Sequence, residues 1–118
     1  DCHTPGFAQN GGATPPSEWL TGDALGWNGP WGTSYAANLR LRLSQMNERE
    51  WLSYARGLNA RPPMPNGILH AMTDADLRAI WRFVRFPGAT GTPAPSALPP
   101  GVEPVGPVVR FPTSPVAG

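Results

Sequence analysis

The chain has 118 residues and a formal net charge of +1, with 16 prolines, 14 glycines and only 14% charged residues. This length suits one small domain with an appendage, and the balanced charge favours neither nucleic acid nor an acidic membrane surface as a partner. No stretch approaches the roughly 20 apolar residues of a membrane span, and the prolines and glycines predict long loops.

The first informative feature is the Cys2-His3 pair. A cysteine followed directly by a histidine is the second half of the C-x-x-C-H signature that attaches c-type haem. The thiol can bond to a haem vinyl group while the adjacent imidazole reaches the iron. Because Cys2 is the only cysteine, no intramolecular disulfide can form. A haem thioether, an intermolecular bridge and an inert thiol remain as alternatives.

Residues 1–33 are predicted to be loop, because glycines and prolines such as Asn28-Gly29-Pro30 break any helical or strand period. Only residues 17–20 suggest a single helical turn. A loop of this length in a compact domain needs something to wrap, and a haem edge would be a suitable object.

Two helices are better marked. The first begins after the N-cap Asn47, where Glu50 completes a capping box, and it stops at Gly57. The second begins at Thr73, carries acidic residues in its first turn and ends at Pro87-Gly88. Its apolar residues recur at helical spacing. They are Leu77, Ile80, Trp81 and Val84.

Residues 87–118 contain nine prolines and show no helical or strand period, which predicts an extended, proline-rich tail. Its valines and Phe111 are too apolar for a purely solvated linker. We therefore expect the tail to lie along a surface, either of its own domain or of a partner. Disorder is the alternative.

Four segments, in order along the chain, resemble class I c-type cytochromes, and especially the cytochrome subunits of membrane-associated alcohol and sugar-acid dehydrogenases. Residues 2–6 (CHTPG) resemble the haem-binding segment, and residues 30–39 (PWGTSYAANL) resemble a P-x-G-T-x-Y-x-x-N segment of those subunits. Residues 61–66 (RPPMPN) resemble the methionine-ligand loop, and residues 72–81 (MTDADLRAIW) resemble the opening of the last helix.

The resemblance implies an all-α fold, with a cytochrome c-like haem-binding domain over residues 1–86 and an extended proline-rich tail over 87–118. It implies one haem c per chain, with Cys2 as the thioether, His3 as the proximal iron ligand and Met64 as the distal ligand. A soft, neutral thioether favours reduced iron, so His/Met ligation raises the reduction potential.

Rival ligands exist. Met64 could instead be an ordinary loop methionine that fills a packing gap. Met46 precedes a helix cap and Met72 occupies a hydrophobic-staple position, so both are typical of packing residues. His70 would give bis-His iron with a lower potential, but a solvated or hydrogen-bonded role is the favoured interpretation.

Candidate donors to the haem propionates gather in and after the second matching segment. Indole, phenol, amide and guanidinium groups can all donate hydrogen bonds to carboxylates, and packing is the alternative role. The candidates are Trp31, Tyr35, Asn38 and Arg40, with Arg42 beside them. Asn38 matches the family position nearest to this role.

The chain departs from the family at its start. The first cysteine of the signature and the whole N-terminal helix, which crosses the last helix in class I cytochromes, are absent from this sequence. We therefore expect the domain to be N-terminally incomplete, and the apolar stripe of the second helix to lack its main partner. Attachment by one thioether, or a decayed cytochrome kept for its surface, are the alternatives.

The expected function is one-electron transfer, so the protein is not an enzyme by itself. The resemblance implies redox partner proteins, such as a dehydrogenase or a respiratory or photosynthetic complex, in the bacterial periplasm or on the outer face of the cytoplasmic membrane. Two alternatives are a haem-free assembly subunit that docks through its tail, and a haem enzyme or sensor with an open distal site.

Overall fold

The computed structural model describes residues 2–111, apart from the side chain of Ala8, so residues 112–118 of the predicted tail lie outside the described part. The elements in chain order are α1 (Phe7–Asn10), the 3-10 helix η1 (Pro16–Glu18), β1 (Gly26–Gly29), β2 (Gly32–Tyr35), α2 (Leu39–Ser44), α3 (Glu48–Gly57), α4 (Asn66–Ala71), α5 (Asp74–Arg85) and β3 (Val108–Arg110). Among them, no helix has the length and apolar character needed to cross a membrane.

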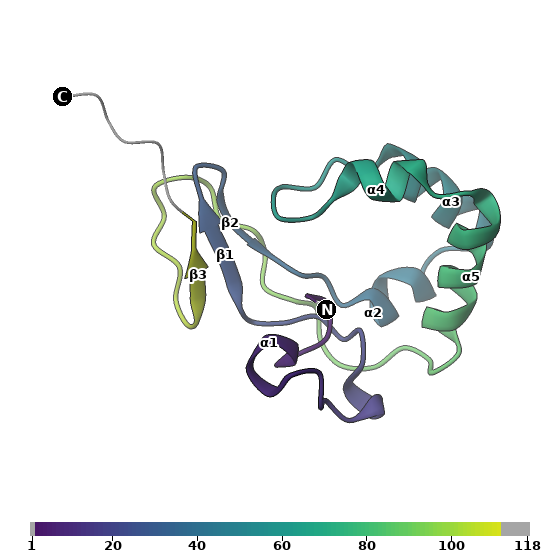
Figure 1. Ribbon diagram of the computed structural model, residues 1–118, viewed down its shortest axis with the longest axis horizontal. Helices are drawn as coiled ribbons and strands as arrows, with labels where there is room; N and C mark the ends of the chain where they lie inside the picture. The colour runs from purple at the N-terminus through teal and green to yellow at the C-terminus, as the bar shows by residue number, and fades with distance from the viewer. Residues whose placement is uncertain (1, 112–118) are drawn as a thin grey trace.

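The expectation of an all-α fold is wrong, because helices pack beside a mixed sheet. The three strands lie in the order β2-β1-β3, with β1 antiparallel to β2 and parallel to β3. The sheet occupies one side of the molecule and α3, α4 and α5 occupy the other (Figure 1). The long N-terminal loop that we expected therefore contains a β-hairpin and the short helix α1.

The hairpin forms because its glycines and prolines supply turn chemistry. Pro30 and Trp31 connect the strands, and proline is favoured at the first central position of a turn. Gly32 follows with φ 105°, a conformation that favours glycine. The Asn28 amide then closes the hairpin by donating to Thr33 Oγ1 at 2.9 Å.

The tail is extended and contains the short strand β3. Its strand β3 pairs with β1 over residues 26–28, and Leu98 forms an isolated antiparallel bridge with Thr33. The β-branched pair Val108-Val109 suits a strand, but three residues are too few to show a period. The described part of the tail therefore packs on its own domain.

Both helices expected from capping signals are confirmed. The Asn47 side chain accepts from the Glu50 amide, and the Glu50 side chain accepts from the Asn47 amide, which is a complete capping box at α3. At α5, the Thr73 hydroxyl accepts from the Asp76 amide at 3.1 Å. The expected turn near residue 17 is the 3-10 helix η1.

The core lies among α2, α3, α4 and α5. Its buried members are Leu43, Trp51, Ala55, Leu69, Leu77 and Val84. Leu77 and Val84 belong to the α5 stripe that we expected to lack a partner, and that expectation is wrong because α2 and α3 cover it. The Trp51 indole also donates to the Leu77 carbonyl at 2.7 Å, which fixes α3 against α5.

Candidate functional site

His3 lies in a short segment that packs against the middle of the chain. The Gly22 amide donates to the His3 carbonyl at 2.7 Å, and the Leu20 amide donates to the Thr4 hydroxyl at 3.1 Å. These bonds bring the imidazole next to the residues that connect β2 to α2. There, Nδ1 of His3 lies 2.8 Å from the carbonyl oxygen of Ala37.

The electrostatics of His3 suit a neutral ligand. Burial lowers the pKa of the imidazole below its usual value, the positive charge of Arg42 acts in the same direction, and the hydrogen bond to Ala37 opposes them. The ring is therefore mainly neutral at pH 7. Because a carbonyl oxygen can only accept, the proton must be on Nδ1, and Nε2 carries the lone pair.

This arrangement matches the usual surroundings of a histidine that binds a metal. Such a histidine almost always donates its second ring N–H to a carboxylate, a carbonyl or water, which fixes the orientation of the ring and raises its basicity. The neighbouring Cys2 is a free, exposed thiol. The described residues contain no group of three or more His, Cys, Asp or Glu side chains that could hold a metal ion.

Met64 lies in the loop between α3 and α4, residues 58–65, which we call the methionine loop. Pro63 and Pro65 flank the methionine and restrict its backbone. Met64 is half-buried and packs against the core cluster, as do Tyr54 and Leu58. The thioether is therefore partly shielded from water at a stiff point of the chain.

Two side chains hold the methionine loop in place. The side-chain amide of Asn66 bonds back across the loop to Ala60. It donates to the Ala60 carbonyl at 2.7 Å and accepts from the Ala60 main-chain N–H at 3.0 Å. From β2, the Ser34 hydroxyl donates to the Pro62 carbonyl at 2.6 Å. The loop is thus closed internally by Asn66 and attached externally to the hairpin by Ser34.

The rival ligands have structural roles. Met46 and Met72 are half-buried and pack against the core cluster. Nε2 of His70 lies 2.7 Å from the carbonyl oxygen of Leu58, so this imidazole joins α4 to the start of the methionine loop. These contacts agree with the packing and hydrogen-bonding roles expected for the three residues.

Asn38 and Arg40 hold the tail. The Asn38 side chain caps α2 by accepting from the Leu41 amide, and it donates to the carbonyls of Thr90 and Thr92 at 2.9 and 3.1 Å. Buried Arg40 donates to three carbonyls, which belong to Ser17, Pro87 and Gly88. In this structure both side chains donate to main-chain oxygens. This is the packing role that we gave as the alternative to binding a haem propionate.

Trp31 directly precedes β2, and Tyr35 is its last residue. The Trp31 indole donates to the Trp27 carbonyl at 3.1 Å, and its ring centroid lies 5.4 Å from that of Phe111 in the tail. Half-buried Tyr35 faces a hollow of about 420 Å³ between α2 and the tail. Of the candidate propionate donors, Tyr35, Asn38 and Arg42 therefore line one hollow, and Trp31 packs on the tail.

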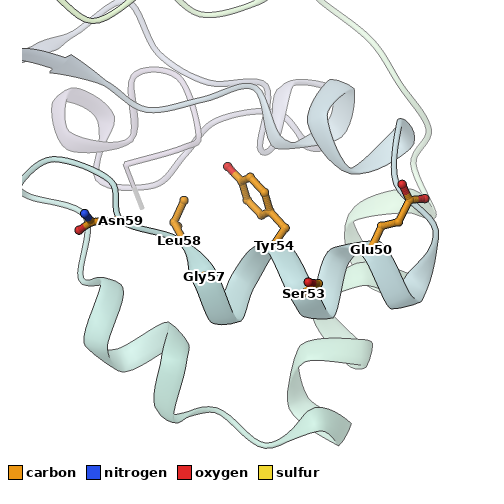
Figure 2. A pocket seen from close by; sticks show the side chains of 6 residues that line it. All are labelled: Glu50, Ser53, Tyr54, Gly57, Leu58 and Asn59. Carbon is orange, nitrogen blue, oxygen red and sulfur yellow. The ribbon is translucent and has the colours of Figure 1, made fainter.

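A second hollow, of about 500 Å³, lies along α3. It is lined by Glu50, Ser53, Tyr54, Gly57, Leu58 and Asn59, and Figure 2 shows Tyr54 and Leu58 pointing to the same side of the helix. Arg42, which lines the hollow beside Tyr35, donates to the Tyr54 hydroxyl at 2.8 Å. This hydrogen bond joins the walls of the two hollows.

Sequence reasoning missed the Ala37 carbonyl and the Ser34 hydroxyl. A main-chain oxygen carries no sequence signal, and a single serine in a short strand carries very little. Comparison with protein-family models, with curated proteins and with solved structures finds no match to this chain. The features that bear on function are therefore the surroundings of His3 and of the methionine loop.

Proposed function

We propose that this protein is a one-electron carrier that holds haem c through Cys2 and His3, with Met64 as the second axial ligand. The observation that carries the proposal is the hydrogen bond from Nδ1 of His3 to the Ala37 carbonyl. It selects the tautomer whose Nε2 can bind iron, and burial keeps that imidazole neutral. The four segments that resemble class I cytochromes support the same assignment.

The residues present fit this cofactor chemically. Cys2 offers an exposed thiol next to the neutral imidazole, and Met64 offers a soft thioether in a loop stiffened by prolines. When bound, haem c supplies a one-electron couple at its iron. Tyr54 and Leu58 add apolar surface to the neighbouring hollow.

The assignment includes redox partner proteins and, as in the proteins that the chain resembles, a periplasmic location. A haem-free assembly subunit that docks through its tail receives less support. The described part of the tail is bound to its own domain by Asn38, by Arg40 and by the pairing of β3 with β1. Those main-chain groups are therefore not free to pair with another protein.

The full chain, produced together with a cytochrome c maturation system, tests the proposal. We expect an intact mass increased by one haem and the sharp α-band of low-spin ferrous haem c. Cys2→Ala should abolish the mass increase, and His3→Gln should abolish the low-spin spectrum. His70→Gln is the matched control and should retain both. Absence of any haem adduct from the unchanged chain would overturn the proposal.

The second ligand is tested separately. Met64→Leu keeps the volume of the side chain but removes the sulfur, so we expect a lower reduction potential and binding of carbon monoxide to the reduced protein. Met46→Leu makes the same change at a packing position and should leave both properties as they are. Equal effects of the two substitutions would exclude Met64 as the ligand.

A further inference from the structure

One hydrogen-bonded junction joins the tail, β2 and the methionine loop. Leu98 of the tail and Thr33 of β2 exchange two main-chain hydrogen bonds, of 2.8 and 2.9 Å. The Leu98 carbonyl also accepts from the Arg61 guanidinium at 3.3 Å. On the adjacent residue of β2, the Ser34 hydroxyl holds the Pro62 carbonyl at 2.6 Å.

The tail lies directly on the backbone of β2 at this point. A Cβ on Gly32 would collide with the Leu98 carbonyl oxygen and would lie 2.7 Å from the carbonyl carbon of Pro99. On one side of this contact, Asn38 holds the carbonyls of Thr90 and Thr92. On the other side, β3 pairs with β1. The tail is therefore anchored on both sides of its contact with the loop.

We propose that the tail braces the methionine loop, with Ser34 and Arg61 as the positioning residues that transmit its hold. The two side chains attach the part of the loop just before Met64, at Arg61 and Pro62, to a platform made by β2 and the tail. The bridge between Leu98 and Thr33 joins the two parts of this platform. Releasing the tail would therefore loosen the segment that carries Met64, because Arg61 would lose its acceptor on Leu98.

The consequence for electron transfer rests on the proposed function. If Met64 is the distal ligand, a looser loop holds the thioether less firmly, and the reduced form loses part of its preferential stabilisation. The mobility of the loop itself does not depend on haem. The two parts can therefore be measured separately.

Gly32→Ala in the full chain tests the brace. The new methyl group pushes the tail away from β2, and we expect the Met64 and Asn66 amides to exchange hydrogen about tenfold faster, as for the loss of a hydrogen bond or two. Gly101→Ala is the matched control. It imposes a side chain at a similarly positive φ of 88°, but no atom lies within 4 Å of its Cβ. Its loop amides should exchange as in the unchanged protein.

A second pair of variants keeps the test decisive if Gly32→Ala does not fold. Ser34→Ala combined with Arg61→Gln removes the two side-chain links, together with a longer 3.4 Å hydrogen bond from the Ser34 hydroxyl to the Trp27 carbonyl, and should give the same faster exchange. Ser44→Ala is the control, because Ser44 also donates to a main-chain carbonyl, that of Leu41 in α2. Unchanged loop exchange in the double variant would overturn the brace.

The haem-bearing protein provides an independent measurement. We expect the double variant to have a lower reduction potential than the unchanged protein, while Ser44→Ala has the same potential. If no haem is attached but loop exchange increases, the proposed function fails and the brace stands. If haem is attached and loop exchange does not change, the brace fails and the proposed function stands.

Discussion

Nδ1 of His3 lies 2.8 Å from the carbonyl oxygen of Ala37, although 34 residues separate the two along the chain. Gly22 makes this approach sterically feasible. Its amide donates to the His3 carbonyl, and a Cβ on it would lie 2.8 Å from the Asn38 nitrogen and 2.9 Å from the Ala36 oxygen. The orientation of the imidazole therefore depends on a position that tolerates only glycine.

Gly22→Ala should raise the pKa of His3. Burial is the largest cause of the lowered pKa, so separating the two segments admits water and moves the value back toward the ordinary 6.5. Loss of the Ala37 hydrogen bond acts the other way but is the smaller effect. An NMR titration of the haem-free protein measures the change.

Gly11→Ala is the control for that titration. Gly11 also has a positive φ, of 63°, but nothing lies within 4 Å of its Cβ. A His3 pKa that moves equally in both variants would show that general strain, rather than the separation of the two segments, is responsible.

Arg40→Met should destabilise the protein by about 2–4 kcal/mol, because hydrogen bonds from a charged donor are strong and three carbonyls lose their partner. The tail should also become more sensitive to limited proteolysis near Pro87, whose carbonyl Arg40 holds. Urea unfolding and timed proteolysis measure the two effects. Arg49→Met, at an exposed position of α3, should change neither.

Leu77→Ala should cost about 2–5 kcal/mol, as expected for a cavity made at a fully buried leucine. Phe83→Ala removes a larger side chain from the same helix, but Phe83 is 59% exposed, and surface substitutions usually change stability by about 0.5 kcal/mol or less. Chemical denaturation of both variants tests whether α5 packs as described. Similar losses would contradict the burial of its stripe by α2 and α3.

Asp74→Asn should weaken the fold in a pH-dependent way. The hydrogen bond from Arg56 lowers the pKa of Asp74, so the carboxylate stabilises the folded state above its unfolded pKa. This stabilisation disappears as the pH falls through the folded pKa. The difference in Tm between the variant and the unchanged protein should therefore be largest at neutral pH and vanish in strong acid.

Asp76→Asn is the control for that measurement. It also removes an acidic residue from the first turn of α5, but it leaves the Arg56 partner in place. A Tm difference for Asp74→Asn that persists in strong acid would show that the carboxylate charge is not its source.

The accuracy of the sequence predictions follows the range of the interactions involved. The capping box of α3 and the N-cap of α5 are each complete within four residues, so Asn47 and Thr73 identify both helix starts correctly. The strand β3 depends on a partner about 80 residues away, and such pairing leaves no local signal. Asn28-Gly29-Pro30 does carry a local signal, but breakers of regular structure and hairpin turns use the same residues.

In the candidate site too, features formed by adjacent residues can be predicted from the sequence, and features formed by distant residues cannot. Cys2-His3 and the prolines around Met64 are recognisable because their chemistry resides in adjacent side chains. The partner of His3 is a main-chain oxygen, which every residue possesses, so only the folded chain identifies Ala37. For Arg40 the sequence left ligand binding and packing open, and in the folded chain its guanidinium donates to carbonyls of the tail.

The parallel pairing of β3 with β1 imposes an order on folding. Gly26 faces Val108, so this ladder closes a loop of roughly 80 residues, and contacts of such long range form slowly. During synthesis the hairpin of β1 and β2 leaves the ribosome long before β3 does. Throughout that interval one edge of β1 stays unpaired and can capture a strand from another nascent chain. This route to aggregation closes only when β3 has emerged and paired with β1.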